Sequence, residues 1–240
     1  MLIVDLFKDE YKFKARLLPA IVCSIPVVIL IWIFTHCICQ TYKLFVFWGP
    51  LFSSLLFSAL AIEWFGVMLI CWMGRAIENI LFDDGLKFPS TEILLWSNDF
   101  LSQQNKKSIR DKIANELGIK LLSQRQEENN IVEARKIIRD AIDRIRTIVK
   151  DGRTVLQYNI HYGAIRNLIG GCCLACPLSL CVTIIGYFKI CEFFILYLGI
   201  ALVVVYALPL VFLSPLLKSF GKRYAKTLLA EYMTIEYNNK

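Results

Sequence analysis

The sequence has little charge and almost no histidine. Charged residues make up 20% of its 240 residues and histidine occurs twice, whereas 57% of the residues are apolar and the mean hydropathy is +0.54. A soluble domain usually has about a quarter of its residues charged. This composition, with its apolar residues gathered in long runs, excludes an ordinary cytosolic enzyme, a disordered tail and a disulfide-stapled secreted domain.

The chain also lacks the short motifs that mark common enzymes. It contains no H-E-x-x-H zinc motif, no G-x-S-x-G nucleophile turn, no Walker loop and no Rossmann fingerprint. The topology that the basic residues predict places His36 and His161 on opposite sides of the membrane, so they are not expected to form an acid–base pair. We therefore expect a protein that is not an enzyme and that needs no cofactor.

Cysteine is absent from residues 74–167, and the nine cysteines all lie in or beside apolar runs. In such runs cysteine behaves as a small apolar residue. Cys173 and Cys176 have the spacing of a metal or redox pair, but they have neither a second pair nor a nearby histidine. We expect no metal site and no disulfide.

Four nearly uncharged runs are long enough to cross a bilayer, which takes roughly 20 apolar residues. They cover residues 17–39, 44–73, 168–188 and 193–217. Short connections join them in pairs, which predicts two antiparallel hairpins. Pro26 lies inside the first run, where a neighbouring helix can satisfy the carbonyl that proline frees. The predicted fold is all-α, a multi-spanning membrane protein with two helical hairpins flanking a helical cytoplasmic domain.

Lysine and arginine predict the orientation. Residues 75–167 hold sixteen of them, whereas the two short connections hold Lys43 and Lys189. Basic residues favour the cytoplasmic side, so both termini and the middle domain are expected in the cytoplasm, with the hairpins in the bacterial inner membrane. The predicted divisions are an interfacial segment (1–16), the first hairpin (17–73), the cytoplasmic domain (74–167), the second hairpin (168–217) and a basic amphipathic tail (218–240).

The cytoplasmic segment is expected to be helical. The pattern predicts a helix over 107–122, a loop over 124–130 and a long helix over 131–150 that Asn130 caps. One face of the long helix is apolar at spacings of three and four, and comprises Ile131, Ala134, Ile138, Ala141, Ile145 and Ile148, widened by Ile137, Ile142 and Val149. Either another helix of this domain or a second subunit covers this seam.

The same long helix carries a basic stripe within about 60° of arc at 100° per residue. Its members are Arg135, Arg139, Arg146, Lys150 and Arg153. One interpretation is a solvated face with acidic neighbours at helix spacing. The other is a binding track for an oligonucleotide or another anionic signal, with Tyr158 and Tyr162 as possible stacking platforms.

Glu63 is an acidic residue deep in a predicted span. A carboxylate there is costly unless it is protonated, paired or facing water. It can form a hydrogen bond inside the bundle, lie at the cytoplasmic interface, or line a pore together with Ser53 and Ser54 of the same helix.

Residues 83–92 predict a turn followed by a helix start. Asp83 and Asp84 are expected in a solvated turn, and Gly85 permits a tight one. Ser90 or Thr91 can cap a helix that begins near Glu92. Such a helix start either serves capping alone or offers free N–H groups to an anion.

Two motifs resemble a family of uncharacterised bacterial membrane proteins with a hairpin–domain–hairpin layout. The first comprises Arg75, Glu78, Leu81, Phe82, Gly85, Pro89-Ser90-Thr91 and Leu94, and the second comprises Asn159, Tyr162-Gly163 and Arg166-Asn167-Leu168. The resemblance covers roughly residues 60–170. Members of this kind resemble membrane effectors of antiphage systems that are encoded beside a nucleotidyltransferase, such as the Hailong system.

The resemblance implies a function. It implies an abortive-infection effector, a homotetrameric ion channel that an oligonucleotide such as single-stranded DNA restrains and that depolarises the membrane when released. The alternative is a non-channel membrane anchor that presents its helical domain to a cytosolic partner. A small-substrate transporter is a third class, but the two halves do not show paired broken helices.

Overall fold

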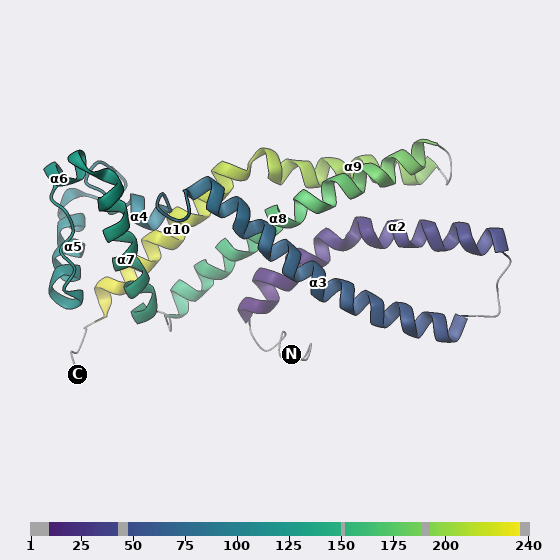
Figure 1. Ribbon diagram of the computed structural model, residues 1–240, viewed down its shortest axis with the longest axis horizontal. Helices are drawn as coiled ribbons and strands as arrows, with labels where there is room; N and C mark the ends of the chain where they lie inside the picture. Colours follow the sequence, from purple (N-terminus) through teal and green to yellow (C-terminus); the bar gives the residue numbers. More distant parts are fainter. Residues whose placement is uncertain (1–9, 43–47, 150–151, 189–192, 236–240) are drawn as a thin grey trace. The chain divides into compact units, whose positions relative to one another are not determined.

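The computed structural model describes residues 10–42, 48–149, 152–188 and 193–235, with side chains for all of them except 35–42 and 48–64. Every regular element in these ranges is a helix, which confirms the predicted all-α class. In chain order the elements are the π-helix η1 (Lys12–Leu17), α2 (Leu18–Tyr42), α3 (Trp48–Phe82), α4 (Pro89–Glu92), α5 (Gln103–Leu117), α6 (Gln124–Asn129), α7 (Ile131–Val149), α8 (Arg153–Tyr187), α9 (Phe193–Val211) and α10 (Leu213–Thr234) (Figure 1).

Four helical segments within the described ranges are long and apolar enough to cross a membrane. They are Lys12–Phe34, Phe65–Phe82, Arg153–Tyr187 and Phe193–Val211. Large apolar side chains on them face outward, and Trp72 and Phe194 are 67% and 69% exposed. A contiguous surface of this kind is unfavourable in water and favourable in lipid. The four segments therefore indicate a membrane protein, as the sequence predicted.

Two of these helices extend further than the predicted spans. The helix α3 ends at Phe82, although hydropathy placed the end of the span at Met73. The helix α8 begins at Arg153, although the span was predicted to begin at Leu168. Hydropathy marks the part of a helix that suits lipid, whereas the helix continues wherever its own backbone hydrogen bonds persist.

The chain forms two compact units. The first, the apolar unit, comprises Met1–Ala76 and Gly163–Leu213, and the second, the polar unit, comprises Ile77–Tyr162 and Ser214–Lys240. Residues of α3 and α8 belong to both units. The C-terminal residues, predicted as a separate tail from 218, belong to the polar unit together with 77–162.

Helix α8 is the centre of the apolar unit. Its buried Cys172 and Ala175 form a core with residues of α2, α3 and α9: Ala20, Cys23, Ile70 and Tyr206. Two glycines allow this packing, because a Cβ on Gly170 would lie 2.5 Å from the backbone of α3, and a Cβ on Gly186 would lie 2.5 Å from the backbone of α9. Small residues let helices approach closely in membranes, where apolar burial itself drives little association.

Two buried side chains of the apolar unit donate to helix carbonyls of η1 and α2. In an α-helix the carbonyl of residue 22 accepts from residue 26, which here is a proline without an N–H. The Asn167 Nδ2 donates to the Ala15 carbonyl at 2.6 Å, and the Tyr206 hydroxyl donates to the Val22 carbonyl at 2.6 Å. The expectation that a neighbouring helix satisfies the carbonyl freed by Pro26 is confirmed.

The polar unit contains α4 to α7, most of α10 and the adjoining ends of α3 and α8. The Asn130 side chain accepts from the Glu133 N–H and caps α7, as predicted. Helix α5 begins after the cap Ser102 and ends at Leu117, where Gly118 takes a left-handed φ of 67°, so the predicted range of 107–122 was too late.

The prediction of a loop over 124–130 was wrong, because α6 occupies Gln124–Asn129. At its start the Ser123 N–H donates to the Gln126 side-chain oxygen at 3.0 Å. A serine followed three residues later by glutamine is a capping-box pattern, so the sequence did contain the signal for this short helix.

The apolar seam of α7 is covered by other helices of the same chain. Helices α4, α5 and α6 pack against α7. The seam residues that become buried are Ala134, Ile138, Ala141, Ile142, Ile145 and Val149. Ile131, predicted as part of the seam, is 40% exposed because it lies in the first turn. Of the two expected coverings, the intrachain one is found.

We predict that Tyr206→Phe destabilises the apolar unit, because it leaves the Val22 carbonyl without a donor in lipid, where no water replaces it. The expected loss is about 1–2 kcal/mol, the upper range for a single hydrogen bond inside a membrane protein. Thermal unfolding of the full chain in detergent measures it. Tyr197→Phe is the matched control, because Tyr197 is 69% exposed. Equal unfolding temperatures for the two variants would contradict the prediction.

Candidate functional site

The basic stripe predicted on the long helix divides into cations with internal partners and cations that face outward. Arg135 Nε lies 2.7 Å from Glu92 Oε1, and this arginine is 17% exposed. Arg146 lies 3.0 Å from Asp143 and holds its guanidinium 5.4 Å from the centre of the Phe88 ring. The contact of Arg135 with Glu92 and that of Arg146 with Phe88 hold the segment around α4 against α7.

The other predicted cations make fewer contacts. Arg139 is 40% exposed, and its nearest acidic oxygen, on Asp140, is 3.9 Å away. Arg153 is exposed in the first turn of α8, so it is not on the same helix as the others. Lys150 lies outside the described residues. Arg139 and Arg153 are therefore the described members of the predicted set that can best meet an external anion.

The predicted pore-lining residues lie on α3, but their surroundings are not part of the structural description. Glu63, Ser53 and Ser54 fall within 48–64, where side chains lie outside the described residues. The three explanations for Glu63 therefore stay predictions.

The two sequence motifs that carry the family resemblance meet in space. In the polar unit, the Tyr162 hydroxyl donates to Glu78 Oε1 at 2.6 Å. In the apolar unit, Gly74, the residue just before the first motif, lies close to the second motif, since a Cβ on it would lie 2.7 Å from the Arg166 carbonyl oxygen. Residues of the first motif on α3 thus contact residues of the second motif on α8. Sequence reasoning gave no partner for either motif, because the residues are more than 80 positions apart.

An aromatic cluster surrounds that tyrosine. Phe88 lies edge-on to Phe82 at 5.2 Å and to Tyr162 at 5.5 Å between ring centres, and Tyr162 stacks on Tyr224 of α10 at 6.4 Å. Tyr162 is 4% exposed, so its ring is not available as the stacking platform that the sequence suggested. Tyr158 remains half-buried.

The turn before α4 forms as expected, but the cap does not. Asp83, Asp84 and Gly85 all have positive φ, of 53°, 50° and 86°, and the two aspartates are exposed. Helix α4 begins at Pro89 rather than near Glu92, and its cap residue is Phe88, which offers no side-chain oxygen. Ser90 and Thr91 are buried inside the four-residue helix, so the predicted capping by either residue was wrong.

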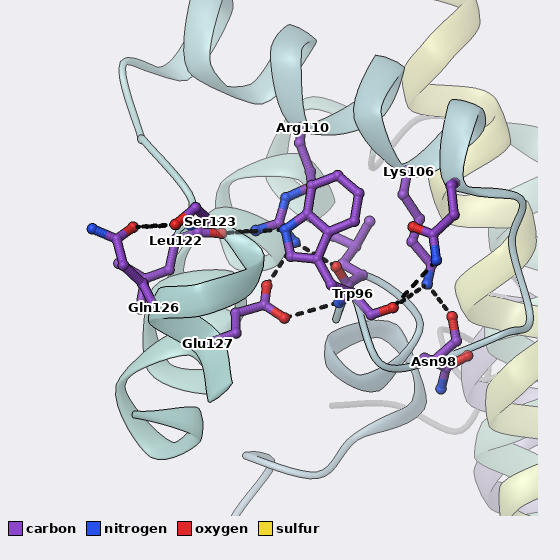
Figure 2. A network of polar contacts seen from close by, with 10 residues as sticks. Trp96, Asn98, Lys106, Arg110, Leu122, Ser123, Gln126 and Glu127 are labelled. Carbon is purple, nitrogen blue, oxygen red and sulfur yellow. Dashed lines mark hydrogen bonds and ion pairs between the residues drawn. The ribbon is translucent and has the colours of Figure 1, made fainter. Parts of the chain in front are cut away.

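A buried polar network joins the α4–α5 connection to α5 and α6 (Figure 2). Arg110 Nη1 lies 2.8 Å from Glu127 Oε1, and both side chains are at most 6% exposed. The guanidinium also donates to the Leu94 carbonyl at 2.7 Å and to the Leu122 carbonyl, and it lies 4.6 Å from the centre of the Trp96 ring. Glu127 Oε2 accepts from the Trp96 N–H at 2.8 Å. One ion pair thus satisfies backbone groups of two separate segments, the α4–α5 connection at Leu94 and Trp96 and the α5–α6 connection at Leu122.

Lys106 is fully buried beside this network. Its Nζ donates to the Trp96 carbonyl at 3.2 Å and to the Asn98 carbonyl, as Figure 2 shows. Burial lowers the pKa of the Lys106 ammonium, because the charged form loses its hydration, and Asp99 and Glu127 oppose that shift. Sequence reasoning missed Lys106, Arg110 and Glu127, because charged residues in a polar segment are expected on the surface.

We predict that Glu127→Gln loosens the polar unit strongly, because it leaves the buried Arg110 charge without a counter-charge. Breaking one side of a buried ion pair costs about 3–5 kcal/mol. Amide hydrogen exchange of residues 94–130 in the full chain measures the change. Glu128→Gln is the matched control, since Glu128 is exposed. Unchanged exchange protection in Glu127→Gln would contradict a structural role for the pair.

Within the described residues, no group of three or more histidine, cysteine, aspartate or glutamate side chains could hold a metal ion. No known protein family matches this chain, and no curated protein and no solved structure matches it either.

Proposed function

We propose that this protein is a membrane effector of bacterial antiphage defence whose polar unit senses an anionic nucleotide or oligonucleotide and gates a pore. The apolar helices would lie in the inner membrane as two hairpins, with both termini and the polar unit in the cytoplasm. The charge distribution supports this orientation, because residues 75–167 hold sixteen basic residues and the short connections hold Lys43 and Lys189. The family resemblance of the two motifs supports the defence role.

The observation that carries the proposal is the closure of the polar unit on itself. Because α4, α5 and α6 cover the apolar seam of α7, this face is not free to bind a partner helix. Apart from Ile131 and Val132 in the first turn, the exposed residues of α7 are polar, and the Arg139 side chain is 40% exposed. A surface of this kind suits a charged ligand better than an apolar protein partner. This favours a ligand sensor over the anchor that the seam alone could have served.

The exposed apolar surface of the spans supports assembly into an oligomer. Among the described residues, only about a sixth of the most apolar 18-residue stretch of Phe65–Phe82 is buried within the chain, and the same holds for Phe193–Val211. Such outward faces can contact lipid or further copies of the chain. A tetramer would bring four copies of Glu63, Ser53 and Ser54 around one axis, which gives a pore the polar lining that a single chain lacks.

We predict that the purified chain in liposomes conducts ions and that short single-stranded DNA lowers this flux. Arg139→Glu should weaken the response to DNA about tenfold, since losing a charge-assisted contact costs about 1.5–3 kcal/mol, less at an exposed site. Glu63→Ala should reduce the flux while chemical cross-linking still captures the oligomer.

The matched control for Arg139→Glu is Lys107→Glu, which reverses an exposed charge on α5. An equal loss of DNA response in both variants would indicate unspecific attraction and reject the assigned stripe. Liposomes that never pass ions above the empty background, with or without DNA, would reject the pore and leave the anchor.

A further inference from the structure

A second candidate binding site lies within the polar unit, between the beginning of α8 and the C-terminal half of α10. It is a pocket of about 500 Å³. Helix α8 contributes Thr154 and Tyr158, and α10 contributes Arg223, Lys226, Thr227, Ala230, Glu231 and Thr234. Pockets of roughly 300–1,000 Å³ accommodate small organic ligands. None of these residues belongs to the basic stripe predicted from the sequence.

The cations of this pocket have no acidic partner within the described ranges. Arg223 and Lys226 are exposed, neither forms an ion pair with another described residue, and they lie almost one turn apart on α10. The Thr227 hydroxyl donates to the Arg223 carbonyl and can still accept from a ligand. Two cations and a hydroxyl on one helix face form a recognition surface for a phosphate group.

The other end of the pocket is a hydrogen-bond acceptor. Glu231 lies five residues beyond Lys226 and eight beyond Arg223, about 8–12 Å along the helix axis. Its carboxylate approaches the residue before α8, since a Cβ on Gly152 would lie 2.9 Å from Glu231 Oε1. A carboxylate at this place repels a second phosphate and accepts hydrogen bonds from hydroxyl groups.

We propose that this pocket binds a single ribonucleotide, with its phosphate at Arg223 and Lys226 and its ribose hydroxyls at Glu231. The half-buried Tyr158 ring offers the base a stacking surface at the α8 wall. The separation of the cations from the carboxylate matches the distance from phosphate to ribose and base in one nucleotide, whereas a polynucleotide would place further phosphates against Glu231. This inference rests on the proposed function, to which it adds a regulatory ligand class and a site.

The test is calorimetric titration of the full chain in phosphatidylcholine nanodiscs with AMP, dAMP, inorganic phosphate and a single-stranded DNA decamer. AMP should bind, and dAMP should bind several-fold more weakly because it lacks the 2′-hydroxyl. The double variant Arg223→Ala/Lys226→Ala should lose at least tenfold in AMP affinity. Glu231→Ala should remove most of the difference between AMP and dAMP. Lys222→Ala is the matched control, because it removes a neighbouring exposed charge outside the pocket.

Several results would overturn the inference. One is that the unaltered chain does not bind AMP, and another is that AMP and inorganic phosphate bind with equal affinity. A third is that Lys222→Ala loses as much AMP affinity per charge removed as the double variant does. Tighter binding of the decamer than of AMP, lost in the double variant, would replace the ribonucleotide by a polynucleotide. AMP binding without any ion flux would reject the proposed pore and keep the pocket, whereas DNA-controlled flux without AMP binding would reject the pocket alone.

Discussion

The constraint on which this structure depends is that a buried carbonyl oxygen needs a donor. In lipid there is no water to supply one. The Val22 carbonyl, left without a helical donor by Pro26, accepts from Tyr206 of α9, and the Ala15 carbonyl of η1 accepts from Asn167 of α8. The polar unit meets the same constraint in the irregular stretches on either side of α5, residues 93–102 and 118–123. There Arg110 and Lys106 donate to carbonyls of segments that have no regular partner. Long-range donors thus specify how helices and loops pack in both units.

The local features of the fold could be predicted from the sequence. Apolar runs marked the membrane segments, the three-and-four spacing marked the buried face of α7, and Asn130 marked its start. In each of these features the interacting residues lie within a few helical turns of one another in the sequence, so a local pattern reveals both of them. The capping box at Ser123 and Gln126 was equally local. It indicates the start of a helix, so it contradicted the loop that was predicted there.

The long-range features could not be predicted, because each depends on a partner far away in the chain. Glu127 is buried because Arg110 supplies its counter-charge and the Trp96 N–H donates a hydrogen bond to it, and nothing in its acidic neighbourhood in the sequence indicates either partner. Arg135 and Arg146 belong to the predicted stripe, yet Glu92 and Phe88 give them structural contacts that helical periodicity does not reveal. The pocket cations Arg223 and Lys226 came from a segment that sequence reasoning treated as a basic tail. The candidate site is therefore a result of packing, whereas the fold class follows from hydropathy.

We propose that the apolar helices lie in the bilayer and hold the polar unit on the cytoplasmic side. Labelling of Lys136→Cys with a membrane-impermeant maleimide tests it most directly, because position 136 is exposed and residues 74–167 contain no native cysteine. Mass spectrometry of the digested chain then locates the label. If the polar unit is cytoplasmic, position 136 stays unmodified in intact cells and becomes fully modified after permeabilisation. Modification in intact cells, or a chain that stays soluble without detergent, would contradict it.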